Sequence, residues 1–71
     1  MSAALTDRDR FAVDLFCDAR ISVGAVVVCR DAAGVPWGAA CATRDEAEAL
    51  ADTWHDARVY GRTRLRDLGR R

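Results

Sequence analysis

The stretch Ile21–Ala42 constrains the fold of this chain most, because it has the pattern of a β-hairpin with a well-defined turn. Asp31 suits the first position of a type I turn, and Gly34 can adopt the left-handed conformation that closes a three-residue loop with a bulge. The loop sets the register of the two arms, since a slip of one residue would turn every side chain to the other face. The predicted strand pairs are Asp31 with Val35, Cys29 with Trp37, Val27 with Ala39, and Ala25 with Cys41.

From this hairpin we expect an α+β fold in which a three-stranded antiparallel β-meander packs on one C-terminal helix. The predicted strands cover about residues 10–17, 21–30 and 35–42, and the predicted helix covers about residues 44–60. In a meander the second strand is central. Pro36 therefore falls on an edge strand, where its missing N–H removes no ladder hydrogen bond.

The segment Asp7–Arg20 fits two periodic patterns. With a period of two, it predicts a strand that extends the apolar face of the hairpin without a break. With a period of 3.6, it predicts a helix that begins after Thr6 as its N-cap and covers the second face of the sheet. The strand is the main prediction, and the alternative is an α-β-β-α order with residues 7–19 helical.

The predicted C-terminal helix has a clear start and a clear end. Thr43 and Glu46 have the spacing of a capping box, and Gly61 is a natural C-terminal stop. One apolar stripe of this helix should lie across the apolar face of the sheet. The residues of that stripe are Ala47, Leu50, Ala51 and Trp54.

The chain beyond this helix has no equally clear pattern. Leu65 and Leu68 are at helical spacing, but no start signal precedes them. We therefore expect one small domain over residues 1–61, followed by a basic tail over residues 62–71 that is mobile or forms one loose turn.

The formal net charge is zero, but the charges are unevenly distributed. Residues 1–57 contain 5 Arg against 10 Asp or Glu, a net charge of −5, whereas residues 58–71 contain 6 Arg against one Asp, a net charge of +5. A chain rich in Arg and without Lys is typical of a GC-rich genome, so we expect a bacterial or phage protein. No apolar run approaches the roughly 20 residues that span a bilayer, and acids stand where a signal peptide has basic residues. These features predict a cytoplasmic protein.

The second face of the predicted sheet is small and apolar where a solvated face should be polar. A contiguous exposed patch of this kind usually marks an interface. We therefore expect a non-enzymatic protein–protein interaction or regulatory module, such as a regulator or inhibitor, that self-associates or docks on a target through this face or an open edge strand. The predicted interface residues are Val26, Val28, Ala40 and Ala42.

The basic C-terminal segment predicts an alternative function, which is nucleic-acid binding. Clustered guanidinium groups attract phosphates, and an Arg-rich terminal arm is one way in which a small protein holds nucleic acid. An acidic protein is a further partner that the same arginines would fit. The predicted contact residues are Arg58, Arg62, Arg64, Arg66, Arg70 and Arg71.

No set of residues predicts catalysis. Three cysteines and His55 are of the types that bind zinc, but the hairpin register separates Cys29 from Cys41 by roughly 13 Å. Thiolates that share a zinc ion lie within about 4 Å of one another. His55 has neighbouring carboxylates but neither a nucleophile nor a cleft. We therefore expect no enzymatic activity, no metal, no cofactor and no small-molecule substrate.

Overall fold

The computed structural model describes residues 5–70 of the chain. The strands form one antiparallel sheet in the order β2-β1-β3, so that β1 is central. This confirms the prediction of an α+β fold with a three-stranded antiparallel sheet. The elements in chain order are α1 (Asp7–Asp18), β1 (Ala25–Arg30), β2 (Pro36–Cys41), α2 (Arg44–Thr53), β3 (Arg58–Gly61) and α3 (Arg62–Gly69).

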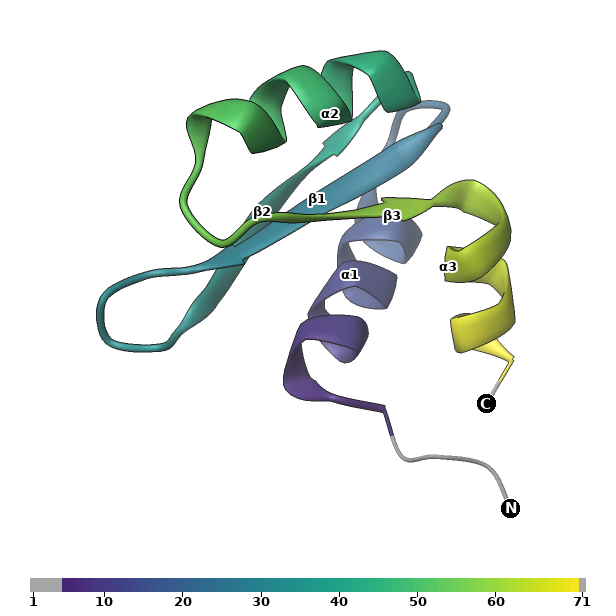
Figure 1. The fold of residues 1–71 in the computed structure, drawn as a ribbon. Coiled ribbons are helices and arrows are strands. Elements are labelled where there is room, and N and C mark those ends of the chain that lie inside the picture. The colour runs from purple at the N-terminus through teal and green to yellow at the C-terminus, as the bar shows by residue number, and fades with distance from the viewer. Residues whose placement is uncertain (1–4, 71) are drawn as a thin grey trace.

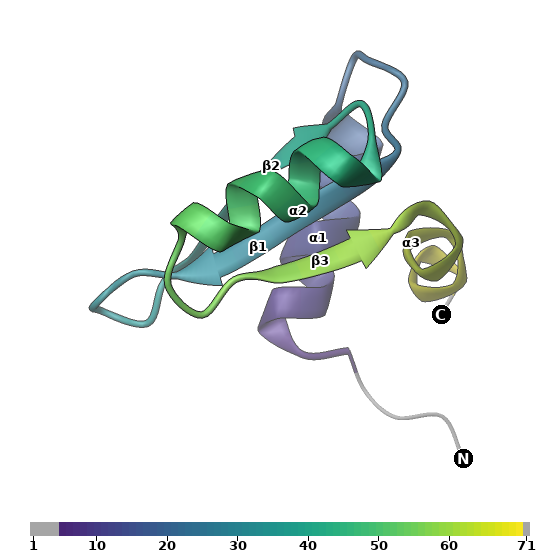
Figure 2. The ribbon, with the colours of Figure 1, turned by 45° about the horizontal axis from the view of Figure 1, so that its top comes forward.

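The sheet is the middle of three layers. Helix α2 lies over one face, and α1 lies over the other face with α3 beside it (Figures 1 and 2). Each face has its own hydrophobic cluster. The α1 face is built around Val26, Val28 and Leu65, and the α2 face around Ala25, Val27 and Ala47.

The hairpin has the predicted turn and the predicted register. The Asp31 N–H donates to the Val35 carbonyl at 3.1 Å, and the Gly34 N–H donates to the Asp31 carbonyl at 2.9 Å. Gly34 has φ 83°, the left-handed conformation that the bulge requires. All four predicted strand pairs form, and Pro36 lies on an edge strand as predicted.

The prediction of a strand over residues 10–17 is wrong, because this segment is part of helix α1. Thr6 caps the helix in a capping box. Its Oγ1 accepts a hydrogen bond from the Asp9 N–H at 3.1 Å, and the Thr6 N–H donates to the Asp9 carboxylate. Ala12 is fully buried against the sheet. The alternative helix over residues 7–19 is therefore the observed one, and the third strand comes from elsewhere in the chain.

Helix α2 begins as predicted after Thr43, whose side chain accepts from the Glu46 N–H, but it ends at Thr53 and not near residue 60. The chain turns at Asp56, which has φ 53°, and then forms β3 beside β1. Val59 and Tyr60 are residue types that favour strands, and Tyr60 pairs there with Val26 of β1. The predicted stripe does pack on the sheet, and its members are Ala47, Leu50, Ala51 and Trp54.

The segment expected to be a mobile tail or one loose turn forms a packed helix over the residues that the structure describes. Residues 62–69 form α3, and Leu65 and Leu68 are buried against α1 and the sheet. Burial of these two leucines fixes the helix, although no side chain caps its N-terminus. Arg71 lies outside the described residues.

The expected bare face of the sheet is covered. Val26 and Val28 are fully buried beneath α1, and Ala40 is half-buried against the same cluster. Ala42 is exposed, but it lies in the turn that leads into α2. The apolar face is therefore covered by helices of the same chain, and its apolar side chains give no reason to expect a second molecule on it.

Candidate functional site

β3 is an outer strand whose second edge pairs with no other strand in the described structure. The backbone N–H and C=O groups of a central strand point to one neighbouring strand and then to the other in alternate residues. Because Asp31 is hydrogen-bonded to Val35, the backbone groups of Ala25, Val27 and Cys29 point towards β2. The backbone groups of Val26 and Val28 therefore point towards Tyr60 and Arg58 of β3. It follows that Val59 presents its N–H and C=O outwards and Gly61 its N–H.

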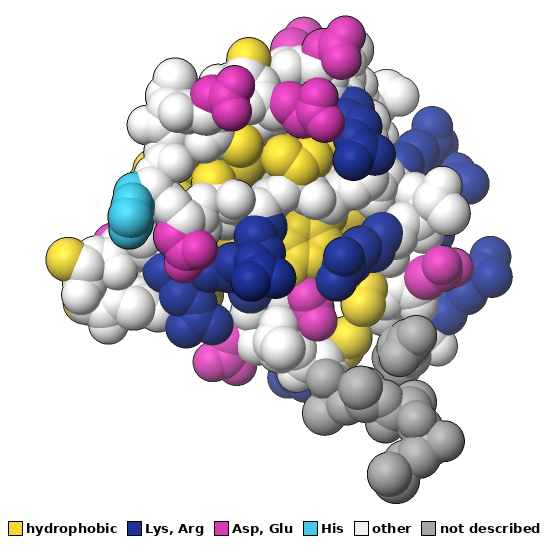
Figure 3. All heavy atoms as spheres, in the orientation of Figure 1, with side chains coloured by type: hydrophobic (Ala, Val, Ile, Leu, Met, Phe, Trp, Pro, Cys, Tyr) yellow, Lys and Arg dark blue, Asp and Glu magenta, His cyan; other side chains and the backbone are white. Residues whose placement is uncertain are grey.

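Arginine side chains surround this edge. In Figure 3 the dark blue side chains, all arginine in a chain without lysine, gather across the middle of the viewed face. We call this region the β3 arginine surface. It consists of Arg8, Arg30, Arg44, Arg58, Arg62 and Arg64, and these six residues line two hollows together with three aspartates, a net charge of +3.

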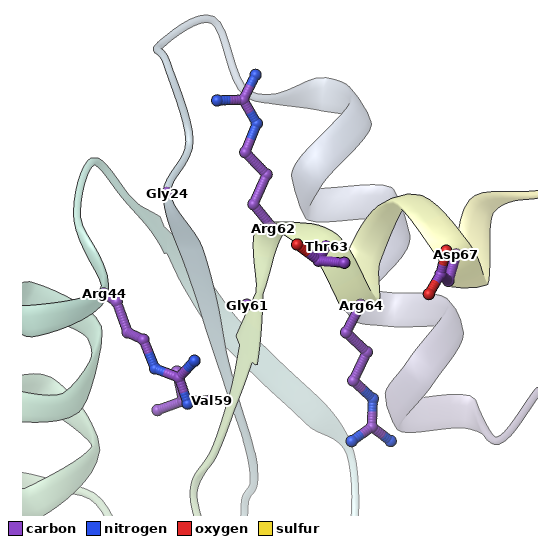
Figure 4. Close-up of a pocket in the computed structure, with 8 residues that line it drawn as sticks. All are labelled: Gly24, Arg44, Val59, Gly61, Arg62, Thr63, Arg64 and Asp67. Atoms are coloured by element: carbon purple, nitrogen blue, oxygen red, sulfur yellow. The ribbon is translucent and has the colours of Figure 1, made fainter.

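The first hollow, of about 500 Å³, lies at the end of β3 where the strand passes into α3. Figure 4 shows Arg44 from the start of α2 and Arg64 from α3 on opposite sides of β3, while Arg62 points away. Arg44 lies close to the strand, since a Cβ built on Gly61 would be 3.5 Å from its guanidinium nitrogen. The outward backbone groups of Val59 and Gly61 therefore lie between two guanidinium groups.

The second hollow, of about 350 Å³, lies on the α1 side of β3. Arg8 contributes from α1, Arg30 from the end of β1, Arg58 from β3 and Arg64 from α3. Arg64 belongs to both hollows, and its guanidinium carbon lies 5.1 Å from the centre of the Tyr60 ring. The two hollows thus form one basic surface on both faces of the strand.

The carboxylates of the second hollow are already engaged. Arg8 donates to Asp56 at 2.9 Å, and this bond is the main reason that the pKa of Asp56 is lowered. The Tyr60 hydroxyl donates to Asp9 at 2.7 Å, which is the main cause of the lowered pKa of Asp9. Burial, followed by this bond to Asp9, raises the pKa of Tyr60 to about 12, so the phenol remains a donor at neutral pH.

Most arginines of the surface have no acidic partner. Within residues 5–70, the ion pairs of the surface are Arg8 with Asp56 and Arg44 with Glu48, the latter at 3.3 Å. Arg30, Arg58, Arg62 and Arg64 form no ion pair in that part of the chain, and all four are exposed. Their guanidinium groups are free to meet anionic groups of another molecule.

The sequence predicted only part of this surface. Arg58, Arg62 and Arg64 belong to it, whereas Arg66 and Arg70 are exposed outside the two hollows. The missed residues are Arg8, Arg30 and Arg44, which lie in the segment with a net charge of −5. Helix α1 and strand β1 bring the first two to β3 through tertiary packing, for which the sequence carries no local signal.

The remaining candidates lie apart from this surface. Cys29 and Cys41 are buried, and burial raises the pKa of both thiols, while Cys17 is exposed on α1. His55 is exposed in the turn after α2. No cluster of three metal-binding side chains occurs among residues 5–70, and no helix in that range is long and apolar enough to cross a membrane.

The β3 arginine surface is accordingly the candidate site, with open backbone groups at its centre and unpaired guanidinium groups on both sides. Comparison of the chain with protein-family models, with curated proteins and with solved structures found no match.

Proposed function

We propose that this protein is a non-enzymatic interaction module that binds an extended acidic segment of a target protein along the open edge of β3. The observation that carries the proposal is the placement of arginines on both faces of a strand that has one open edge. Residues of an added strand alternate between the two faces of the sheet. Acidic residues on one face would meet Arg44, and those on the other would meet Arg58 and Arg64.

The same arginines disfavour pairing of β3 with a second copy of itself. Charged side chains on a short edge strand are a common protection against edge-to-edge association. Two copies of β3 side by side would bring like charges together, which is destabilising across strands. The edge therefore selects a partner of opposite charge, and a target protein fits better than self-association.

Nucleic acid is the second candidate, and the observation that favours it is the exposure of Arg62, Arg66 and Arg70 on and just after α3. The protein as a whole has no net charge, whereas nucleic-acid-binding domains are usually basic. Tyr60, the aromatic residue of the surface, is buried and offers no face for base stacking. A protein segment is therefore the preferred partner.

The test is a pair of substitutions at Val59. Val59→Pro removes the outward N–H that an added strand would use, without removing a bond to β1. Val59→Ala is the control, because it shortens the side chain but keeps the N–H. The probe is a short peptide with repeats of Glu-Glu-Thr-Thr, which carries carboxylates on both faces of an added strand. By fluorescence anisotropy we expect Val59→Pro to bind at least about tenfold more weakly than Val59→Ala.

A peptide with Gln in place of Glu is the matched control and should not bind measurably. Equal affinity of the two Val59 variants for the acidic peptide would contradict strand addition. Binding of a single-stranded oligonucleotide, lost in Arg66→Gln with Arg70→Gln but unaffected by Val59→Pro, would support the nucleic-acid alternative in its place.

A further inference from the structure

We infer that the second hollow, on the α1 side of β3, is a binding site for a phosphate monoester dianion. Its basic residues Arg8, Arg30, Arg58 and Arg64 come from four separate elements that meet at this point. This site shares Arg58 and Arg64 with the surface proposed for the acidic segment, but it does not use the open backbone edge and does not depend on strand addition.

Arg8 is the built part of the site. Its side chain is 10% exposed and is held by a 2.9 Å bond from Nη2 to Asp56. Within the described chain, no fully buried side-chain nitrogen or oxygen lacks a hydrogen-bond partner. The donors of Arg8 that have no protein partner therefore keep some accessible surface, and Arg8 is one of the residues that line the hollow.

The charge of the hollow matches the charge of a phosphate monoester. Four arginines against Asp9 and Asp56 give a net charge of +2. A phosphate monoester carries about −1.5 to −2 at pH 7 and has three strong acceptor oxygens. The planar fork of a guanidinium group binds such oxygens in pairs, and Arg30, Arg58 and Arg64 form no ion pair in residues 5–70 that would compete.

The size and lining of the hollow favour a phosphoryl group on a small carrier. A volume of about 350 Å³ is near the lower end of the range for ligand pockets. Its aromatic residue, Tyr60, is buried under Arg64 and cannot stack on a nucleobase. The phosphoryl group could come from a free phosphate ester or from a phosphorylated side chain in a bound protein segment, and these two sources share the same chemistry.

The test uses O-phosphoserine as the probe and serine as its uncharged-side-chain control. The measurement is a titration of the ¹⁵N-labelled full-length protein followed by NMR. We expect O-phosphoserine, but not serine, to shift the amide signals of Arg8, Arg58 and Tyr60. Arg58→Gln and Arg30→Gln should each weaken binding by about fivefold, and Arg66→Gln, which removes the same charge outside the hollow, should change it by less than about twofold.

Because both tested arginines are exposed, their loss should leave the fold intact, and the NMR spectrum of each variant checks this directly. Equal weakening by Arg58→Gln and Arg66→Gln would overturn the site, as would shifts confined to Arg44 and Arg62. A phosphorylated acidic peptide that binds more tightly than O-phosphoserine and also shifts Val59 and Gly61 would support the protein source. Binding of O-phosphoserine without any effect of Val59→Pro would support the site alone, even if strand addition fails.

Discussion

Tyr60 links β3 to α1 through one hydrogen bond to Asp9, and it is the only tyrosine in the chain. Its phenol is buried beside a carboxylate, and both conditions favour the neutral form. We predict that tyrosinate absorbance titrates with a midpoint near a pKa of about 12. In Asp9→Asn the midpoint should fall but stay above the ordinary value of about 10, because burial remains. A wild-type midpoint near 10 in a folded protein would contradict this environment.

The ion pair of Asp56 with Arg8 should make the stability of the fold depend on pH in the acid range. The pKa of Asp56 is lowered by Arg8, so its contribution to stability is present above the pKa of the unfolded chain and is lost as the pH falls through the lower folded pKa. We predict that the free energy of unfolding decreases from about pH 4 downwards. Asp56→Asn should flatten this decrease, and Asn tolerates the left-handed backbone at this position. Urea unfolding at several pH values measures the slope, and an unchanged slope in the variant would contradict the role of the pair.

At the scale of elements, the hairpin could be predicted because its information is local. Asp31 and Gly34 specify the loop, and the loop specifies every strand pair. The segment that forms α1 could not be assigned from its own residues, since periods of two and 3.6 both fit. Its assignment depends on β3, a distant segment that takes the open edge of β1.

The candidate site shows the same limit. Arg58, Arg62 and Arg64 were found because they are close together in sequence, whereas Arg8 and Arg30 reach the surface only when α1 and β1 pack beside β3. The distribution of charge along the sequence therefore predicts only a basic C-terminal tail. Charge counted over the fold gives a basic surface that draws half of its arginines from the acidic part of the sequence.

Helix α3 gives a prediction about the C-terminal segment. Leu65 is fully buried against α1 and β3, so Leu65→Ala should lower the free energy of unfolding by about 2–5 kcal/mol. Arg66→Gln, on the exposed side of the same helix, should change it by less than about 0.5 kcal/mol. Urea unfolding of the two variants compares them directly. Equal stability would mean that the segment is a dispensable tail.

At the scale of the whole molecule, three layers bury both faces of the sheet within one chain. A domain of this size is stabilised by only about 3–5 kcal/mol, so it cannot accommodate a charge in its core. We predict that Val28→Asp unfolds the protein, because Val28 is fully buried beneath α1, and that the wild type is a monomer. Circular dichroism and light scattering test these two statements. If the wild type were a dimer and Val28→Asp were a folded monomer, the result would contradict this prediction and support an interface on the sheet face.

The proposed function depends on the open edge of β3, and amide hydrogen exchange tests that edge directly. In the free protein, we predict protected amides at Arg58 and Tyr60, which face β1, and fast exchange at Val59 and Gly61, which face outwards. Addition of the Glu-Glu-Thr-Thr peptide should slow exchange at Val59 and Gly61 by at least about tenfold. Bound peptide with unchanged exchange at these two amides, or amides already protected in the free protein, would contradict binding by strand addition.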